Sequence, residues 1–369
     1  MVQRVCLVSG GTGGHLMPAL ALARALHAAG HESLLVTEGR AVERELLRRE
    51  LPDVTGVELP PAGRSRLGLP WWLLRATAAA RRVLREQRID RVVSTGGRPS
   101  VPVALAARSL GVPVYLLEQN AVTGRANRLL RPFAERIYHG LPSREPVSAR
   151  ALVTGTPLRP EIGAMSRERA RELLGLHAAT PVVLVTGGSQ GARALNETVP
   201  QALLRLHQPL QVLHLAGLQA DDVVRRFYAA SAGRIVAVVR PVAHDMDRMF
   251  AAADLVICRG GGTTVAELCA VGRAAVIVPY PHHRDRQQLR NAEVLANAGA
   301  AVVVEEADLS VETLTGLVRC LLADPARLLA MGTSAKGCLP GDAAAAILRD
   351  MGLAARAPAA SPEAGRGQP

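Results

Sequence analysis

His15 is the first residue of the chain whose type and position could do acid–base chemistry. It directly follows a glycine-rich turn, residues 10–14, and it begins a helical pattern after a short apolar run. Glycines let a backbone turn sharply and approach a ligand closely, and the free amides at the start of the next helix favour an anion. A neutral imidazole beside such an anion site could take the proton of a substrate hydroxyl. His15 is therefore a candidate general base, although a histidine at this place can equally cap or pack.

The second half of the chain repeats this order of strand, glycine turn and helix. Residues 182–192 read VVLVTGGSQGA, and a further glycine cluster, RGGGTTVAE, occupies residues 259–267. Thr263 or Thr264 could add a hydroxyl to a phosphate held by these amides, and the carboxylate of Glu267 could accept from both hydroxyls of a ribose. The alternative for Glu267 is a favourable charge near a helix N-terminus. Two such halves predict two nucleotide-binding-like α/β domains with a cleft between them.

Polar residues follow strand-like runs at other places too. Glu118, Gln119 and Asn120 come at the carboxyl end of a run in the first half, where open α/β sheets place their ligands. In the second half, the polar segment PYPHHRDRQQLRN, residues 279–291, follows a buried run and could recognise a sugar. Arg159 could clamp a phosphate from the segment that joins the halves. No metal-ligand spacing stands out, so we expect no metal and no cofactor, and a diphosphate would be neutralised by helix ends and arginines.

The elements that must position these residues alternate along the chain. Apolar runs predict strands at residues 4–9, 33–37, 55–59, 91–94, 112–117, 136–138 and 151–154, and then at 182–186, 211–215, 235–239, 255–258, 275–278 and 301–304. Helical patterns lie between most of them and over 311–323, 325–335 and 342–351, which favours parallel sheets covered on both faces. The segment GTPLRP, residues 155–160, predicts a linker, and residues from 354 to 369 are expected to be a disordered tail.

Composition limits the class of protein. The chain has 369 residues, 49% of them hydrophobic, which suffices for two cores. It lacks an apolar run of 18 residues and a basic segment before the first strand, so we expect neither a spanning helix nor a secretory signal. The formal charge of +12 comes almost wholly from arginine, and with 2% aromatic residues we expect no nucleic-acid partner. The five scattered cysteines predict buried thiols and no disulfide framework.

Both tryptophans of the chain, Trp71 and Trp72, lie side by side in LGLPWWLLR, residues 67–75, with arginines following. A peripheral membrane contact needs aromatic rings at headgroup level and cations on anionic lipid. The alternative is a helix that covers the sheet and exposes one ring, because adjacent helical residues point about 100° apart. Pattern alone favours the second interpretation.

Six motifs, in their order and spacing, closely resemble the MurG family of peptidoglycan enzymes: GGTGGH, EQN, GTPLR, GGSQGA, CRGGGTTVAE and HRDRQQLRNA. That family transfers N-acetylglucosamine from UDP-N-acetylglucosamine to the 4-hydroxyl of the muramoyl sugar of lipid I, which carries a pentapeptide on undecaprenyl diphosphate, and so forms lipid II. The resemblance implies an inverting, metal-independent GT-B glycosyltransferase with two Rossmann-like domains. Residues 1–157 would bind the acceptor and an anionic membrane surface, and residues 158–338 the UDP-sugar. Residues 339–353 would return to the first domain, and the enzyme would lie peripherally on the cytoplasmic face of the cell membrane.

The resemblance also implies roles for single residues. His15 would be the base, with Glu118 as the alternative. The acceptor would meet Thr12, Gly13, Gly14, His15, Asn120 and Arg159. In the donor site, Ser189 and Thr264 would hold the phosphates, Glu267 the ribose and Val242 the uracil. Gln287, Gln288 and Asn291 would contact the sugar, Arg259 would order the site, and Gly262 would belong to it as well. Thr12, Gly13, Gly14 and Arg159 would belong to both the donor site and the acceptor site. Trp71 and Trp72 match the membrane-contact region of the family.

The chain departs from the family pattern at Arg98, Leu117, Thr156 and Gly260, where the family commonly has an aromatic residue, His, Asn and Ser. The first three bear on the acceptor side. The alternatives are a GT-B enzyme that uses a UDP-sugar with another lipid or soluble acceptor, a UDP-N-acetylglucosamine 2-epimerase, and a non-catalytic nucleotide-sugar-binding protein. In either transferase we expect the domains to close over the donor, since the cleft must shed water.

Overall fold

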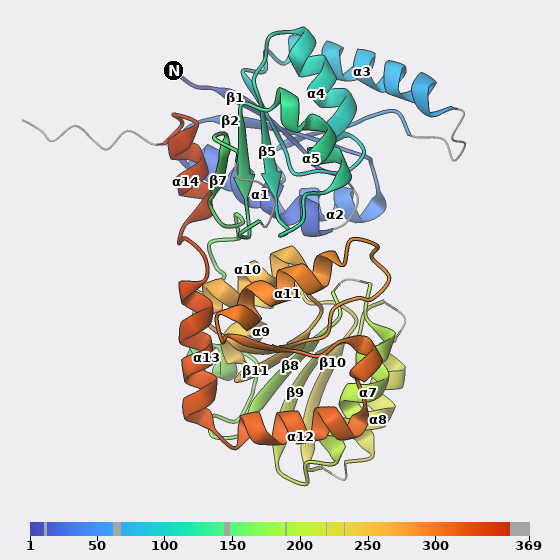
Figure 1. Ribbon diagram of the computed structural model, residues 1–369, viewed down its shortest axis with the longest axis vertical. Helices are drawn as coiled ribbons and strands as arrows, with labels where there is room; N and C mark the ends of the chain where they lie inside the picture. The colour runs from blue at the N-terminus through green and yellow to red at the C-terminus, as the bar shows by residue number, and fades with distance from the viewer. Residues whose placement is uncertain are drawn as a thin grey trace, which may run out of the picture.

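The computed structural model describes residues 1–10, 13–61, 68–143, 148–188, 190–218, 220–231 and 233–354. Within these ranges the chain forms two α/β domains, one above the other in Figure 1. The predicted site residues Thr12 and Ser189 and the predicted tail from residue 355 lie outside the described residues. No helix in the described ranges is both long enough and apolar enough to cross a membrane.

The first domain is built on a parallel sheet of seven strands in the order β3-β2-β1-β4-β5-β6-β7. The strands are β1 (Arg4–Val8), β2 (Glu32–Thr37), β3 (Thr55–Glu58), β4 (Arg91–Ser94), β5 (Val114–Glu118), β6 (Arg136–His139) and β7 (Ala151–Val153). On one face, α1 (Gly13–Ala28) packs its leucines into a core with β1 and β2, beside α2 (Ala41–Glu50). On the other face, α3 (Leu69–Glu86), α4 (Ser100–Ser109) and α5 (Arg125–Leu130) close a second core. A parallel sheet is thus covered on both faces, as its apolar strands require.

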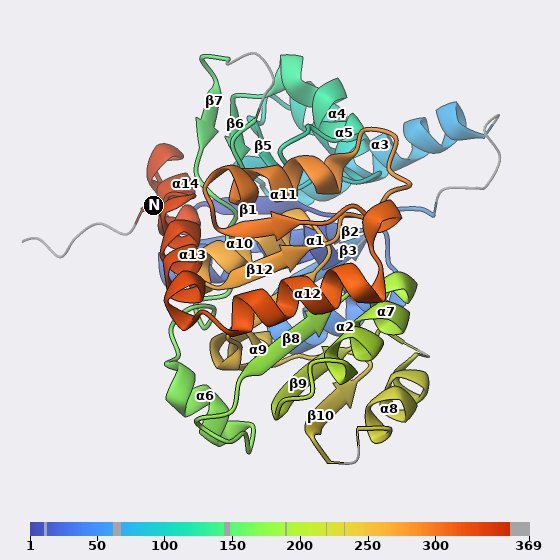
Figure 2. The ribbon, with the colours of Figure 1, turned by 60° about the horizontal axis from the view of Figure 1, so that its bottom comes forward.

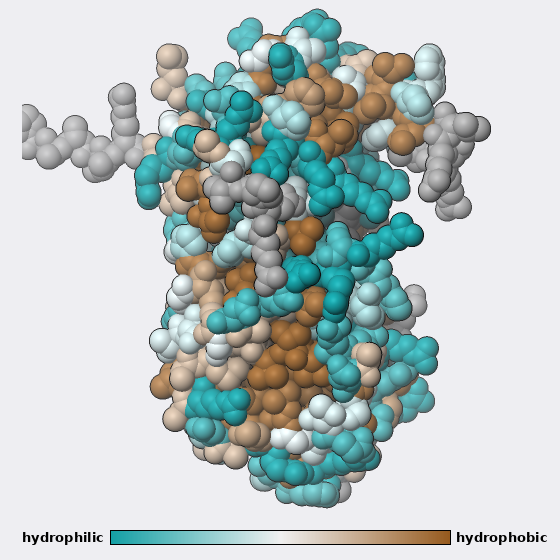
Figure 3. All heavy atoms as spheres, in the orientation of Figure 1, coloured by the Kyte–Doolittle hydropathy of each residue, from teal (hydrophilic) through white to brown (hydrophobic). Residues whose placement is uncertain are grey.

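The outer end of α3 keeps apolar side chains at the surface. Leu69, Trp71 and Leu74 are all exposed, and apolar atoms gather around this end of the helix in Figure 3. The buried residues of α3, such as Ala76 and Ala80, come later in the helix. The start of α3 therefore projects beyond the core that its second half covers.

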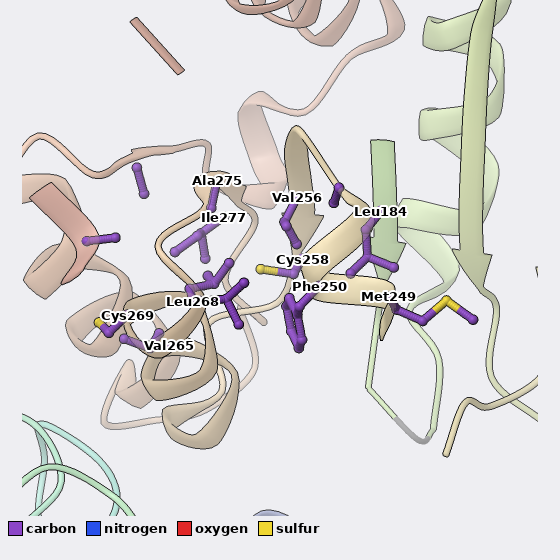
Figure 4. Close-up of a cluster of buried hydrophobic side chains, with 14 of the residues drawn as sticks. Leu184, Met249, Phe250, Val256, Cys258, Val265, Leu268, Cys269, Ala275 and Ile277 are labelled. Atoms are coloured by element: carbon purple, nitrogen blue, oxygen red, sulfur yellow. The ribbon is translucent and has the colours of Figure 1, made fainter. Parts of the chain in front are cut away.

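The second domain repeats the plan with a six-stranded parallel sheet in the order β10-β9-β8-β11-β12-β13. The strands are β8 (Val182–Thr186), β9 (Leu210–Leu215), β10 (Ile235–Arg240), β11 (Leu255–Cys258), β12 (Ala274–Ile277) and β13 (Ala301–Val303). One face is covered by α7 (Arg193–Leu204), α8 (Asp221–Ala229) and α12 (Val311–Leu322). The other face is covered by α6 (Arg167–Leu173), α9 (Met246–Ala252), α10 (Gly262–Val271) and α11 (Gln287–Asn297). Figure 4 shows Phe250 of α9 and Leu268 of α10 against strand residues such as Cys258.

Both sheets reverse their strand order at the point from which the glycine turns emerge. The reversal lies between β1 and β4 in the first sheet and between β8 and β11 in the second. Open α/β sheets bind ligands at this place, outside the carboxyl ends of the strands. The two turns of the first domain pack closely, since Gly97 has φ +91° and a Cβ there would lie 2.4 Å from the carbonyl oxygen of Gly10. In each domain the fold therefore brings the glycine turns to the carboxyl-terminal edge of the sheet.

The chain crosses between the domains twice. It passes from β7 to β8, and after α13 (Pro325–Gly337) it returns to the first domain as α14 (Ala343–Asp350), so that α13 and α14 lie along the same side of the molecule in Figures 1 and 2. Ile347 and Leu348 pack into the first core, and the Tyr138 hydroxyl donates to Asp350 at 2.8 Å. On this division of sheets and cores, we propose the domain boundary at residues 157–158.

The predicted strands are all present: β4, β8 and β11 have the predicted bounds, and the ends of the others differ by at most two residues. The largest shift is in β5, which begins at Val114 because Pro113 has no amide hydrogen for the ladder. The prediction of buried thiols is correct for Cys6, Cys258 and Cys269 but wrong for Cys320, which is exposed, and Cys338, which is half-buried. Cys320 does not lie on the buried face of α12, which is formed by Leu314, Thr315, Val318 and Leu321.

Replacing Tyr138 by Phe should lower the free energy of unfolding of the first domain by about 1 kcal/mol, because it removes one hydrogen bond to a carboxylate and keeps the ring. Arg136, at 3.4 Å, would remain as a partner of Asp350. Urea unfolding followed by tryptophan fluorescence measures this, since both tryptophans lie on α3. Tyr280→Phe, at an exposed site, is the control. Equal stability of the two variants would mean that this bond does not hold α14 in place.

Candidate functional site

A cavity of about 990 Å³ lies between the two domains, and the candidates His15, Glu118, Asn120 and Gln287 are on its wall. From the first domain its walls include His15, the turn 96–98, residues of the 118–129 segment and the start of α3. From the second domain they include the loop 282–285 and Gln287. A cavity of several hundred Å³ between domains is the usual setting for a small-molecule site.

His15 is held by a backbone carbonyl. Its Nδ1 lies 2.7 Å from the carbonyl oxygen of Thr95, which can only accept, so Nδ1 carries the proton and Nε2 has the lone pair. The ring lies against Gly96, where φ is +103° and a Cβ would come 3.1 Å from Cε1 of the imidazole. The glycine thus makes room for the ring, and the carbonyl selects the tautomer in which Nε2 is basic.

The carboxylate of Glu118 accepts hydrogen bonds from the loop that follows it. The side chain is 1% exposed. Its Oε1 accepts from the backbone and side-chain amides of Asn120 at 3.1 and 3.0 Å, and its Oε2 accepts from Gly124 N at 2.8 Å and Asn127 Nδ2 at 3.0 Å. Four donors leave this carboxylate little capacity to take a substrate proton. Of the two candidate bases, the geometry favours His15.

Asn291 joins the domains through its side-chain amide. The residue is 0% exposed. Its Oδ1 accepts from Ala121 N at 2.8 Å, and its Nδ2 donates to Asn120 Oδ1 at 3.0 Å and to Gly260 O at 2.9 Å. Both amide hydrogens are therefore used in this conformation. A donor sugar would have to exchange with these bonds, so the sugar contact of Asn291 stays a prediction.

The starts of α1 and α10 also touch across the cleft. Thr263 Oγ1 donates to Gly14 O at 3.0 Å, and a Cβ at Gly262 would lie 2.4 Å from Gln119 O. Two helix N-termini, each favourable to an anion, thus face one region. Gly260 likewise lies against the next loop, because a Cβ there would come 2.2 Å from Gln288 O. A serine at this position would therefore require the backbone at Gln288 to shift.

Arg259 organises the loop before α11. It is almost buried and donates to the carbonyls of Val278 at 3.1 Å and Pro279 at 3.2 Å, and it pairs with Glu306 at 2.5 Å. Its guanidinium also lies 5.8 Å from the centre of the Tyr280 ring. These contacts support the ordering role expected for Arg259.

The other donor candidates lie around this loop. The Oε1 of Gln288 accepts from Tyr280 N at 3.0 Å, and Gln287 is on the cavity wall. Thr264 and Val242 are both half-buried, the first in the opening turn of α10 and the second after β10. Their contacts with a nucleotide stay predictions.

Arg159 lies at the hinge and on the wall of a second cavity, of about 910 Å³, beside the linker. It donates to His244 O at 3.0 Å and approaches Glu50 at 3.8 Å, and Glu50 also pairs with Arg24 at 2.7 Å. A contact with the acceptor diphosphate, as the resemblance implies, would require Arg159 to leave these partners. Its positive charge acts on Glu267, where burial raises the pKa to about 7 and Arg159 offsets part of the rise.

The two tryptophans differ in exposure, as helical geometry predicts. Trp71 is 68% exposed. Trp72 is half-buried, donates from Nε1 to Pro60 O at 2.8 Å and lines the cavity. One ring is therefore free for a surface contact, and the other holds the start of α3.

Sequence reasoning missed Thr95 and Asn127 as parts of this site. It named Thr263 as a possible phosphate ligand, whereas in this structure the Thr263 hydroxyl donates to Gly14 O, and it named Gln119 as a candidate without a specific role. Thr95 acts through its backbone carbonyl, for which a side chain gives no signal. Asn127 acts through Glu118, and only the fold brings the two together. Gln119 lies within the EQN motif, so its place was detectable although its partners were not.

Replacing Glu267 by Gln should change how stability depends on pH. A protonated Glu267 stabilises the fold below its unfolded pKa of about 4.3, and this contribution is lost as the pH rises through about 7, because the carboxylate then ionises where it is poorly solvated. We expect the wild type to lose stability relative to Glu267→Gln between these pH values. Unfolding midpoints across the range measure it, with Glu135→Gln, at an exposed site, as control. Parallel curves for wild type and Glu267→Gln would contradict the expectation.

Comparison with known proteins follows the same two halves. Residues 5–139 match the model of the glycosyltransferase family 28 N-terminal domain, and residues 182–344 match that of the glycosyltransferase family 28 C-terminal domain. The UDP-N-acetylglucosamine--N-acetylmuramyl-(pentapeptide) pyrophosphoryl-undecaprenol N-acetylglucosamine transferase of Stutzerimonas stutzeri (strain A1501) is 39% identical over 355 residues, 94% of this chain and 98% of the relative. The transferase of the same name from Pseudomonas savastanoi pv. phaseolicola is 38% identical over 353 residues, 93% of this chain and 96% of the relative.

Among solved structures, the crystal structure of Acinetobacter baumannii MurG has a TM-score of 0.78 and 32% identity, and the match covers 95% of this chain and 99% of that one. A putative UDP-N-acetylglucosamine 2-epimerase from Listeria monocytogenes has a TM-score of 0.69 but 16% identity, with 95% of this chain and 97% of that one covered. The second likeness concerns the fold alone. The chain belongs to glycosyltransferase family 28 and has the GT-B fold of two Rossmann-like domains.

Proposed function

We propose that the chain transfers N-acetylglucosamine from UDP-N-acetylglucosamine to lipid I, which is N-acetylmuramyl-(pentapeptide) pyrophosphoryl-undecaprenol, and so forms lipid II. The names of relatives that match it over almost their whole length state this donor and this acceptor. The observation in the structure that carries the proposal is the bond from Nδ1 of His15 to the carbonyl of Thr95, at 2.7 Å. It leaves a basic nitrogen on a residue that lines the cavity between the domains.

The reaction needs a base for the acceptor hydroxyl and a site for the leaving diphosphate. In our proposal Nε2 of His15 takes the proton of the 4-hydroxyl while its oxygen attacks the anomeric carbon of the donor, and UDP leaves from the opposite face. The imidazolium that forms keeps its Nδ1 hydrogen bond to Thr95, which stabilises the charge. The configuration at the anomeric carbon is inverted.

The UDP diphosphate would lie at the start of α10. This helix begins at Gly262 after the Gly261 N-cap, and its side-chain cap is absent among the described contacts. Free amides at a helix start favour an anion, and Thr264 supplies a hydroxyl in the first turn of the helix. The half-buried Glu267 lies on the same helix, in a place that suits a ribose diol once the carboxylate is ionised.

The cavity favours a lipid-linked acceptor over a soluble one. Beside His15 and Asn120, its wall includes Leu69, Trp72 and Leu73 from the start of α3. An amphiphilic acceptor could place its sugar at the polar residues and its polyprenyl chain along the apolar ones. We infer that the lipid leaves the cavity toward the exposed end of α3.

The same end of α3 is the surface that we propose for membrane contact on the cytoplasmic face. Leu69, Trp71 and Leu74 are 54%, 68% and 64% exposed. Arg75, Arg81 and Arg82 follow on the same helix and are exposed as well. An amphipathic helix of this kind binds at the interface, where its apolar residues enter the headgroup region and its cations attract anionic lipid.

His15→Ala should abolish most transfer and leave donor binding intact. We expect kcat to fall by roughly 10²- to 10⁴-fold, the usual contribution of a general base. Transfer of labelled N-acetylglucosamine to a short-chain lipid I analogue, with EDTA present, measures kcat, and titration with UDP-N-acetylglucosamine measures binding. His27→Ala, in the last turn of the same helix, is the matched control.

The outcomes of that assay separate the alternatives. Full transfer by His15→Ala would remove His15 as the base and leave Glu118 as the candidate. If the wild type bound UDP-N-acetylglucosamine tightly but transferred nothing to the analogue, the assignment of lipid I as the acceptor would be contradicted. Conversion of UDP-N-acetylglucosamine into UDP-N-acetylmannosamine, with the bond to UDP kept, would instead indicate the epimerase. Loss of transfer with EDTA would contradict a metal-independent reaction.

Trp71→Ser with Leu74→Ser should weaken binding to vesicles that contain anionic phospholipid by about tenfold or more, since two large apolar side chains no longer enter the interface. Co-sedimentation with these vesicles measures the change. Leu329→Ser, which replaces an equally exposed leucine on α13 of the second domain, is the control. Binding that is unaltered in the double variant would place the membrane contact elsewhere.

A further inference from the structure

We propose that Gln119 is a positioning residue for proton transfer. Its side chain fixes the Thr95 carbonyl that orients His15, and its backbone is the point where the donor-side turn at Gly262 meets the first domain. The proposal rests on the proposed function, because it gives Gln119 a part in the proton transfer of that reaction.

The Thr95 carbonyl is held from two sides. Thr95 directly follows β4, and both its amide, at 2.9 Å, and its hydroxyl, at 3.1 Å, donate to the carbonyl oxygen of Val8 at the end of β1. Its own carbonyl oxygen accepts from His15 Nδ1 at 2.7 Å and from Gln119 Nε2 at 3.1 Å. A carbonyl oxygen has two lone pairs. Both acceptor positions are therefore in use, one by the base and one by Gln119.

The sheet places Gln119 at this carbonyl. Gln119 directly follows β5, which pairs with β4 so that Leu116 lies beside Ser94. The side chain thus reaches from the end of one strand to the end of its neighbour, and it is 2% exposed. A second and longer bond, 3.4 Å, runs from Nε2 to Leu117 O. A buried amide held in this way cannot exchange its bonds for water at low cost.

The backbone of Gln119 lies at the domain junction. Its carbonyl oxygen is 2.4 Å from the place that a Cβ of Gly262 would occupy. The next two residues, Asn120 and Ala121, carry the bonds to Asn291 of α11. One short segment therefore contacts the start of α10, the start of α11 and, through Thr95, the base. In this structure the donor-side turn at Gly262 and the orienting carbonyl of the base, Thr95 O, therefore both contact Gln119.

This arrangement has a consequence for the base itself. The charged and titratable groups that share the cavity with His15 are Glu118, Arg98, Arg125, Arg128 and the loop from His282 to Asp285. Glu118 is bound by four donors of its own loop. Gln119 is the neutral group that competes with His15 for one oxygen. Without its amide, that oxygen would accept more strongly from Nδ1 and would favour the imidazolium.

Gln119→Met keeps the length of the side chain and removes the donor. We expect kcat for transfer to fall about tenfold, as for the loss of one hydrogen bond in the transition state, with the KM of both substrates unchanged. The acidic limb of the kcat/KM profile should move to higher pH. Gln119→Glu has the same shape, and in its ionised form it should move the limb further, since a carboxylate beside Thr95 cannot donate to that carbonyl and favours the imidazolium more. Gln201→Met, at an exposed glutamine of α7, is the matched control.

The proposal would be overturned if the pH profiles of both Gln119 variants superimposed on that of the wild type. This holds even if kcat were lower, because a merely structural role would lower activity without moving the acidic limb. Unchanged kcat would overturn it as well. If Gln119→Met does not fold, the isosteric Gln119→Glu carries the test alone. Failure of the proposed function looks different, since the wild type would then not transfer to lipid I or would do so without His15.

Discussion

The hydrogen bond between His15 and the carbonyl of Thr95 is the interaction on which the site depends. It is 2.7 Å long, and it selects one of the two neutral tautomers of the imidazole, so that the basic nitrogen is defined. Other features follow from the need to hold it. Gly96 has no side chain, so the ring fits against it, and Thr95 is tied twice to β1. The backbone carbonyl of Thr95, directly after β4, thus orients the histidine, a role that a carboxylate has in many enzymes.

The two domains can use this base together because glycine lies where they meet. At Gly262 even a Cβ would collide with the backbone of Gln119, while Asn291 and Thr263 make hydrogen bonds across the junction. The starts of α1 and α10 are thereby brought to one region of the cleft. Positive helix ends from both domains, together with arginines, offer the field that a diphosphate requires. The cleft is built from backbone amides as much as from side chains.

Much of this architecture could be predicted from the sequence, because apolar strands and glycine turns alternate regularly in both halves. The parallel sheets covered on both faces follow from the βαβ pattern, whereas the strand order, which sets where the turns meet, is seen only in the structure. The partners of single residues could not be predicted. The carboxylate of Glu118 is used by Asn120, Gly124 and Asn127, and Asn291 is used by the junction, because side-chain geometry decides both. Arg159 lies with Glu50 at the hinge for the same reason. Backbone groups such as the Thr95 carbonyl leave no mark in the amino-acid types.

The tautomer of His15 can be observed directly. In a chain labelled with ¹⁵N in histidine, long-range ¹⁵N–¹H correlation distinguishes a protonated ring nitrogen from one with a lone pair, and the His15→Ala variant identifies the signals of this residue among those of the ten histidines. At a pH where the ring is neutral, we predict a protonated Nδ1 and an unprotonated Nε2. A protonated Nε2, or a mixture of both forms, would mean that the Thr95 carbonyl does not fix the ring and that His15 is not held ready as the base.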